Sequence, residues 1–200
     1  MRSGGSIGID LDNTLASYEV SLGHIADSLG VSSEGHSKRA LRDAIRVQGG
    51  DELWQLVQAQ IYGPRMHEAV LARGALDFIR MCRQQNIRIW IISHKTEFSP
   101  VDPQRTPLRA KALEWLETQG VLTTGVAAAD VFFESTRAAK LERIGICEPD
   151  IFIDDLAEVL DDPGFPPAVK KIHFCPDMSS RADATPFAHF DDIRRHIFGH

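Results

Sequence analysis

An apolar run near the start of the chain ends abruptly in two carboxylates. Ile7-Gly8-Ile9 is followed by Asp10-Leu11-Asp12-Asn13-Thr14. The apolar residues are typical of a buried strand, and parallel sheets in α/β domains place their ligand sites just beyond the strand ends. Because side chains alternate along an extended chain, Asp10 and Asp12 are expected to point the same way, toward one Mg²⁺. The alternative for this segment alone is an Asx-type turn without chemistry.

Two later segments place groups suited to phosphate after short apolar strands. Ser93 follows the apolar run 87–92, and its hydroxyl can donate a hydrogen bond to a phosphate oxygen. Lys140 lies where a helical pattern begins after the strand predicted at 131–133. Its ammonium group is a compact positive charge that suits the neutralisation of phosphate. Taken alone, Lys140 is better explained as a solvated surface lysine.

A second pair of acids, Asp154-Asp155, ends another apolar run. Adjacent carboxylates repel one another unless a cation or hydrogen bonds offset the repulsion. The alternation of apolar strands with helical patterns favours an α/β fold, in which helices cover a parallel sheet. The strands are predicted near residues 6–10, 87–92, 131–133, 150–153 and 170–174.

In this order along the chain, four motifs resemble those of the haloacid dehalogenase (HAD) superfamily. They are Asp10-Leu11-Asp12-Asn13-Thr14, Ser93, Lys140 and Asp154-Asp155. Each motif is short, but the four together span nearly the whole sequence. The resemblance implies a Rossmann-like core, with a parallel sheet flanked by helices, and a Mg²⁺-dependent phosphatase-like hydrolase.

The resemblance also assigns roles to the motif residues. Asp10 is expected to be the nucleophile that accepts the phosphoryl group, and Asp12 the general acid and base. Ser93 and Lys140 are expected to bind the oxygens of the transferring phosphoryl group. Superfamily members that act on haloacids or phosphonates generally lack an acid at the position of Asp12. Hydrolysis of an ordinary phosphate ester is therefore favoured over dehalogenation.

Mg²⁺ is the cofactor that the resemblance implies. The side chains of Asp10 and Asp154 and the backbone carbonyl of Asp12 are expected to hold it, with Asp155 as a supporting carboxylate.

A long helical segment separates the first two motifs. Glycine and serine clusters divide it into three predicted helices, with the Gly49-Gly50 pair between the second and the third. This segment lies where members of the HAD superfamily often carry a cap, so the resemblance implies that residues 16–70 form a small helical cap that excludes water and selects substrate. Residues 1–15 and 71–200 are predicted to form the catalytic core.

Further residues are predicted to contact the substrate because they adjoin the strand ends or lie in the proline-rich loop and helix start after the second motif. They are Asn13, Thr14, His94, Lys95, Arg105 and Arg109. The alternative for the two arginines is simple solvation, since arginine is mostly exposed.

Composition agrees with a soluble enzyme and says little about its substrate. The formal net charge of −6 gives no sequence-wide signal for nucleic acid binding. No apolar run approaches the ~20 residues that a membrane-spanning helix needs, and nothing resembles a signal peptide. We therefore expect a cytoplasmic monomer or homodimer whose partner is a small phosphorylated metabolite.

The predicted reaction is hydrolysis of a phosphate monoester, for example of a sugar phosphate or a nucleotide. The sequence leaves two alternatives open. One is phosphoryl transfer to an acceptor other than water, as in phosphomutases. The other is a regulatory protein that binds phosphate without turnover.

Overall fold

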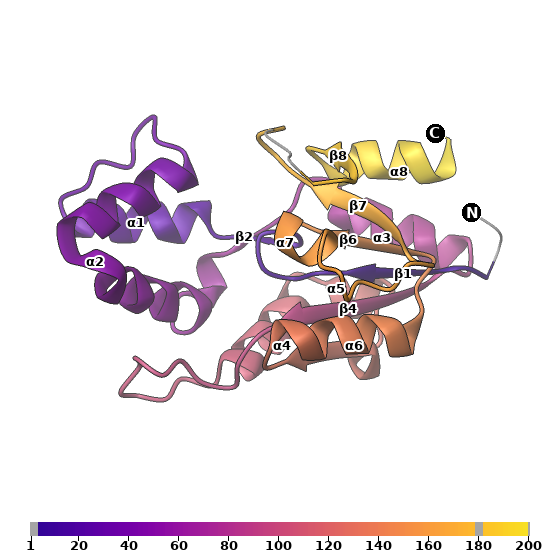
Figure 1. Cartoon of the computed structure of the whole chain (residues 1–200), viewed down its shortest axis with the longest axis horizontal. Helices are drawn as coiled ribbons and strands as arrows, with labels where there is room; N and C mark the ends of the chain where they lie inside the picture. The colour runs from indigo at the N-terminus through magenta and orange to yellow at the C-terminus, as the bar shows by residue number, and fades with distance from the viewer. Residues whose placement is uncertain (1–3, 179–181, 200) are drawn as a thin grey trace. The chain divides into compact units, whose positions relative to one another are not determined.

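The computed structural model describes residues 4–178 and 182–199 of the 200-residue chain. The chain forms two compact units, which are drawn in Figure 1. The first unit comprises Met1–Ala16, Leu71–Thr96 and Leu116–His200, and the second comprises Ser17–Val70 and Glu97–Trp115.

A six-stranded sheet is the centre of the first unit, and each strand runs parallel to its neighbours. The prediction of an α/β fold with a parallel sheet is confirmed. The strand order is β5-β4-β1-β6-β7-β8, with β1 at Ser6–Ile9, β4 at Arg88–His94, β5 at Val131–Glu134, β6 at Ile151–Asp154, β7 at Lys170–Phe174 and β8 at Thr185–Phe187. The edge strand β8 is an addition to the five predicted strands.

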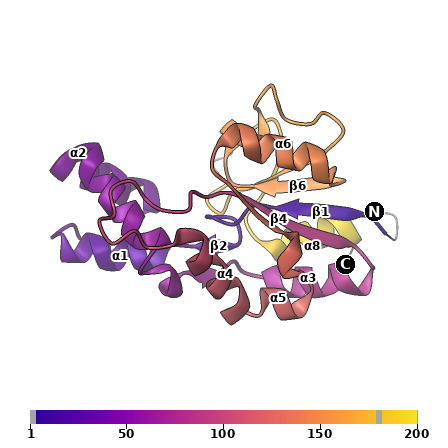
Figure 2. The ribbon, with the colours of Figure 1, turned by 90° about the horizontal axis from the view of Figure 1, so that it is seen from below.

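Helices cover both faces of this sheet, with α6 on one face and α3, α5 and α8 on the other (Figure 2). On the α6 face, Phe152 from the sheet packs in one hydrophobic cluster with Leu141 and Ile144 from the helix. On the other face, the ring of Phe190 lies 5.4 Å from that of Phe78. The helices are α3 at Ala75–Gln84, α5 at Val121–Thr124, α6 at Arg137–Cys147, α7 at Ala157–Leu160 and α8 at Phe190–Phe198, with a 3-10 turn, η2, at Ala128–Asp130.

The middle of the sheet positions the first motif. Strand β1 lies between β4 and β6, and Gly8 in β1 is needed for close packing because an added Cβ would lie 2.5 Å from the Phe152 ring. Parallel strands present their carboxyl ends at the same edge of a sheet. The residues that end β1, β4 and β6 therefore meet at one edge.

The second unit is helical. It contains α1 at Glu19–Ser28, α2 at Lys38–Tyr62, the 3-10 turn η1 at Met66–Glu68 and most of α4, which spans Leu108–Thr118. Helix α2 is interrupted at Gly49 and Gly50, whose backbone dihedrals are non-helical. Gly50 has φ 68°, a conformation that side-chain-bearing residues rarely adopt. The glycine pair thus separates two helical segments, as the sequence predicts.

The proline-rich segment after the second motif belongs to the second unit. Within this unit, the Leu108 amide donates to the Glu97 carbonyl at 2.9 Å, and the Trp115 indole donates to the Ala69 carbonyl at 3.0 Å. The sequence prediction places residues 97–115 in the catalytic core, whereas the structure groups them with residues 17–70. The short strands β2, Ala16–Ser17, and β3, Val70–Leu71, pair with each other where the chain passes between the units. That the second unit acts as a cap stays a prediction.

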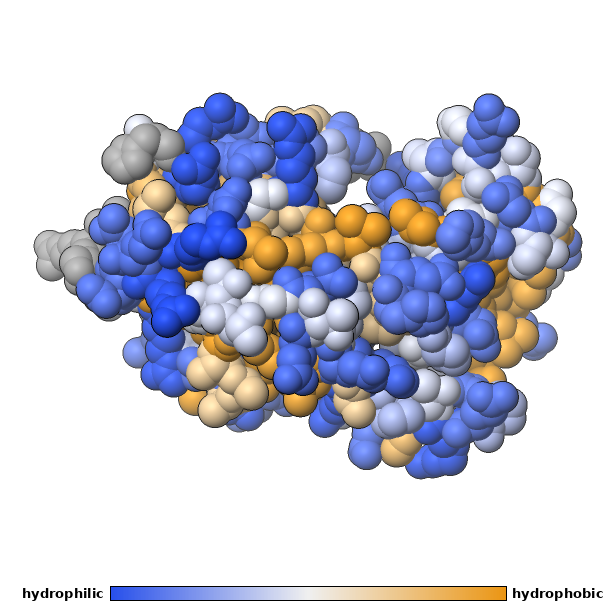
Figure 3. Space-filling view, turned by 180° about the vertical axis from the view of Figure 1, so that it is seen from behind, coloured by the Kyte–Doolittle hydropathy of each residue, from blue (hydrophilic) through white to orange (hydrophobic). Residues whose placement is uncertain are grey.

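Hydrophilic residues cover much of the face seen in Figure 3, with hydrophobic residues showing between them. Within the described residues, every helix is too short or too polar to cross a lipid bilayer.

Candidate active site

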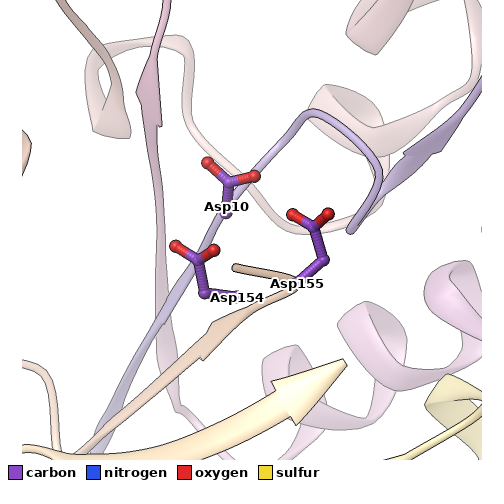
Figure 4. Close-up of side chains that lie close together, drawn as sticks. All are labelled: Asp10, Asp154 and Asp155. Atoms are coloured by element: carbon purple, nitrogen blue, oxygen red, sulfur yellow. The ribbon is translucent and has the colours of Figure 1, made fainter. Parts of the chain in front are cut away.

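Three carboxylates converge at the edge of the sheet in the first unit. Asp10 directly follows β1, Asp154 ends β6, and Asp155 comes next (Figure 4). One oxygen from each carboxylate lies within 4.8 Å of the others, which is close enough for all three to contact one metal ion. Asp10 and Asp154 are almost completely buried, and Asp155 is half-buried. The two acidic motifs therefore meet as predicted from their places at strand ends.

Lys140 lies between two of these carboxylates. Its Nζ donates to Asp10 Oδ1 at 2.7 Å and to Asp154 Oδ2 at 2.6 Å. Lys140 comes from the first turn of α6, where the Thr136 hydroxyl caps the helix by accepting a hydrogen bond from the Ala139 amide at 3.1 Å. This cap fixes the start of the helix, and with it the point from which the lysine reaches the acids.

Burial and crowding shift the pKa values of these groups. Burial raises the pKa of Asp10, Lys140 opposes this rise, and the charges of Asp154 and Asp12 add to it, so that the pKa lies at about 7. Burial alone would lower the pKa of Lys140, yet the charges of Asp10 and Asp154 raise it above the ordinary lysine value. Three carboxylates around one ammonium group leave an excess of negative charge, which a bound cation would offset.

The donor chemistry of this cluster fits a hard divalent cation. All three candidate ligands are carboxylate oxygens, which Mg²⁺ and Ca²⁺ prefer, and none is a sulfur or a ring nitrogen. Burial and the neighbouring carboxylates raise the pKa of Asp10 despite its contact with Lys140, so a bound cation would favour its ionised form. The cluster can therefore hold a metal ion.

Asp12 is paired with a second buried lysine. Lys95 Nζ lies 2.9 Å from Asp12 Oδ2, and the Lys95 side chain is only 2% exposed. The sequence predicts that Lys95 contacts the substrate, whereas the structure shows it in contact with the expected general acid. This pairing links the first and second motifs.

Ser93 presents a buried hydroxyl group without a partner. It is 1% exposed near the end of β4, and its Oγ makes no hydrogen bond to any other described residue. A buried hydroxyl without a partner is unusual, because burial of an unsatisfied polar group is unfavourable. An added acceptor, such as an oxygen of a bound anion, would satisfy it.

The loop after β1 places Thr14 against the acids. Its Oγ1 lies 3.4 Å from Asp10 Oδ2 and 3.4 Å from Asp155 Oδ1. The carbonyl of Leu11 accepts bonds from the amides of Thr14, Leu15 and Ala16, which closes a tight turn. Asn13 adopts φ 64° in this turn, a conformation that asparagine tolerates. Thr14 therefore contacts carboxylates, and its predicted role toward substrate stays untested, as does that of Asn13.

The other predicted substrate contacts lie in different surroundings. The exposed His94 ring has its Nε2 3.1 Å from the Ser135 carbonyl. Arg105 and Arg109 belong to the second unit, and the Arg105 guanidinium lies 4.4 Å from the centre of the Phe98 ring. Their roles remain predictions.

Sequence reasoning missed His173. This buried residue of β7 pairs in register with Asp154, and its Nε2 lies 2.9 Å from the backbone carbonyl of Asp155. It therefore helps to fix the backbone that carries the third carboxylate. The available signal was a histidine between two apolar residues in the strand predicted near residues 170–174.

No protein-family model matches the chain, and no curated protein does, but many solved structures share its fold. The HAD-hydrolase YfnB from Bacillus subtilis, in a form bound to magnesium, is 14% identical over 100% of both chains, with a TM-score of 0.62. A HAD family hydrolase from Deinococcus radiodurans, with bound phosphate and sodium, is also 14% identical, over 98% of this chain and 96% of that chain, with a TM-score of 0.62.

Protein tyrosine kinase A from Mycobacterium tuberculosis is 17% identical over 99% of this chain and 100% of that chain, with a TM-score of 0.61. At these identities the likeness concerns the fold. This chain has the fold of the HAD-superfamily hydrolases.

Proposed function

We propose that this chain hydrolyses a phosphate monoester of a small metabolite, using Mg²⁺ and a covalent aspartyl-phosphate on Asp10. The surroundings of Asp10 carry the proposal. Its buried carboxylate accepts a hydrogen bond from Lys140 and lies in a cluster with Asp154 and Asp155. The unpartnered Ser93 hydroxyl lies near the end of the neighbouring strand. Acidic metal ligands beside phosphate-binding donors are what phosphoryl transfer needs.

The reaction would proceed in two displacements at phosphorus. In the first, a carboxylate oxygen of Asp10 attacks the phosphorus atom while the bond from phosphorus to the ester oxygen breaks. Asp12 gives its proton to that departing oxygen. In the second, Asp12 takes a proton from water as the water oxygen attacks the same phosphorus. The bond from phosphorus to Asp10 breaks, and free phosphate leaves.

Ser93 and Lys140 would bind the transferring group. The Ser93 hydroxyl would donate to a phosphoryl oxygen and gain the partner that it lacks among the described residues. Lys140 would keep its positive charge, because its pKa is raised, and would offset the charge that develops on the phosphoryl oxygens.

Asp10, Asp154 and Asp155 would hold Mg²⁺. The bound ion would supply Lewis-acid stabilisation of the phosphoryl oxygens. The chain's own contribution is to hold these three carboxylates close together before the ion binds, with Thr14 bridging two of them and His173 supporting the third.

Asp12 favours ester hydrolysis over dehalogenation, because a departing alkoxide needs a proton and a departing halide does not. Transfer to an acceptor other than water uses the same first displacement, so it differs only in what attacks the aspartyl-phosphate. We propose water as the acceptor and a sugar phosphate or a nucleotide as the substrate class.

Phosphate release from a panel of sugar phosphates and nucleoside monophosphates tests the proposal. We expect Mg²⁺-dependent release from at least one ester, complete loss of release in excess chelator, and loss in Asp10→Asn. Asp43→Asn, an exposed acid of the second unit, is the matched control and should retain full activity. Phosphate release that persists in chelator would contradict the metal role, and tight binding of esters without release would indicate a non-catalytic protein. Appearance of a new phosphorylated acceptor would indicate a phosphotransferase.

A further inference from the structure

Among the described residues of the first unit, two buried lysines contact aspartates, and the proposed function explains only one of these lysines. Lys140 lies among the metal-site carboxylates. Lys95 contacts Asp12 instead, with Nζ 2.9 Å from Oδ2. The Lys95 side chain is 2% exposed, whereas that of Asp12 is 18% exposed. Lys95 is therefore more deeply buried than Asp12.

Stability alone is a weak reason to bury this lysine. Removing an ammonium group from water is unfavourable, and the attraction to one carboxylate often fails to repay that loss. Asp12 keeps some contact with solvent and would remain hydrated without the lysine. The burial of Lys95 therefore points to a role in fixing where the Asp12 carboxylate lies.

Both members of the pair are anchored to the sheet. Lys95 follows β4 directly, and its backbone amide donates to the Glu134 carbonyl of β5 at 2.8 Å. Asp12 lies in the tight turn after β1, and its neighbour Leu11 accepts the hydrogen bonds that close the turn. The contact therefore joins two fixed backbones, which is the arrangement that limits the motion of a side chain.

We propose that Lys95 is a positioning residue for Asp12, holding its carboxylate in the orientation from which it exchanges a proton with the ester oxygen. This inference rests on the proposed function, because it assumes that Asp12 serves as the general acid. It departs from the prediction that Lys95 contacts the substrate. In the proposed arrangement, Lys95 acts on the reaction through Asp12.

The leaving group separates the two roles. An alkyl ester needs a proton on its departing oxygen, whereas the 4-nitrophenyl ester leaves as a stable anion with little help. If Lys95 positions Asp12, its loss should slow alkyl esters selectively. If Lys95 binds the phosphoryl group, its loss should slow both esters alike, because both carry the same phosphoryl group.

The test compares Lys95→Met with the matched control Lys111→Met, which removes a lysine from an exposed ion pair with Glu114 in the second unit. We expect Lys95→Met to lower kcat/KM for an alkyl phosphate about 10- to 100-fold more than for 4-nitrophenyl phosphate. Lys95→Arg, which keeps a cation, should recover part of the alkyl-ester activity, and Lys111→Met should change neither ester. Equal losses on the two esters would overturn the proposal.

A double-mutant cycle gives an independent outcome. In an Asp12→Asn background, Lys95→Met should cause no further loss on the alkyl ester, because the group that it positions is already gone. If the double variant instead loses kcat/KM by the product of the two single-variant losses, Lys95 acts on the substrate directly. That result would contradict the proposal. Thermal unfolding of each variant distinguishes loss of fold from loss of positioning.

A spectroscopic measurement tests the pairing without activity. In protein labelled with [15N]lysine, the buried Lys95 ammonium group should give a slowly exchanging signal, identified by its disappearance in Lys95→Met. Asp12→Asn should abolish that signal and leave the Lys140 signal in place. Persistence of the Lys95 signal in Asp12→Asn would contradict the proposal. Failure of the proposed function looks different, since the wild-type chain would then release no phosphate from any ester.

Discussion

Buried lysine–aspartate pairs of the first unit contrast with exposed ion pairs of the second. In the first unit, Lys140 and Lys95 are each 2% exposed and contact aspartates at the sheet edge. In the second, Arg46 and Lys111 are 43% and 41% exposed and form ion pairs on the surface. Buried charges are unfavourable unless paired, and they concentrate at functional sites. This contrast supports the proposed chemical role of the buried pairs, whereas the exposed pairs remain hydrated.

The largest expected effect comes from removing the lysine among the carboxylates. Lys140→Met should lower kcat roughly 100- to 1000-fold on every ester, the loss typical of removing one preorganised donor to a developing charge. Single-turnover measurements with saturating Mg²⁺ would check it. A loss of kcat confined to one substrate would contradict the contrast between the units. A buried charge that stabilises the transferring phosphoryl group should affect every ester.

A smaller effect is expected where a charge of the second unit selects the substrate. Arg105→Ala should weaken hydrolysis of the natural substrate about 10- to 150-fold, equivalent to losing a charge-assisted hydrogen bond worth about 1.5–3 kcal/mol. A small generic ester should be unaffected, since it offers no remote group to hold. Parallel kinetics on the two esters would sharpen the comparison. No loss on either ester would mean that Arg105 does not contact the substrate, and Arg109→Ala provides the same test at the second predicted arginine.

The next prediction concerns stability and pH in the metal-free protein. Folding raises the pKa of Asp10 from 3.8 to about 7, so between these values the folded chain holds a proton that the unfolded chain has lost. The contribution of Asp10 to stability therefore falls as pH rises through this range. As the pH rises from about 4 to about 7, the free energy of unfolding of Asp10→Asn should increase relative to that of wild type. The difference should reach roughly 1–4 kcal/mol, because each unit of pKa shift corresponds to about 1.4 kcal/mol.

Urea unfolding in chelator, from about pH 4 to about pH 8, measures this difference. A constant gap between the two proteins would show that Asp10 is not held in an unfavourable ionised state.

The smallest effect is expected for an exposed pair of the second unit. Arg46 Nε lies 2.9 Å from Asp51 Oδ1, with the two side chains 43% and 75% exposed. Arg46→Ala should change the free energy of unfolding by less than about 1 kcal/mol, because exposed ion pairs are screened by water and salt. Denaturant unfolding would check it. A much larger change would show that this unit depends on its surface charges after all.

The sheet and the residues at its edge could be predicted from the sequence, because apolar strands that end in polar groups are a local signal. Asp10, Ser93 and Asp154 each follow or end such a run. Strand β8 could not be predicted, since it is short, partly exposed and contains Pro186. Proline lacks a backbone donor and suits an edge strand, so it weakens any strand signal.

Long-range packing explains the other differences. Residues 97–115 join the second unit through contacts such as that of Trp115 with Ala69, which are 46 residues apart. No local sequence pattern indicates a contact over such a separation. The pairing of Lys95 with Asp12 is also long-range, and a lysine after a strand looks the same in sequence whether it contacts substrate or an acid.

Chemical trapping of the phosphorylated chain tests the role of Asp10 most directly. Wild-type protein mixed with its best ester and Mg²⁺ would be quenched in acid within one turnover, reduced with borohydride and mapped by peptide mass spectrometry. We expect the reduced residue at Asp10, formed at least as fast as phosphate is released, and none in Asp10→Asn. Turnover without any modification at Asp10, or modification of a different residue, would contradict the proposed mechanism.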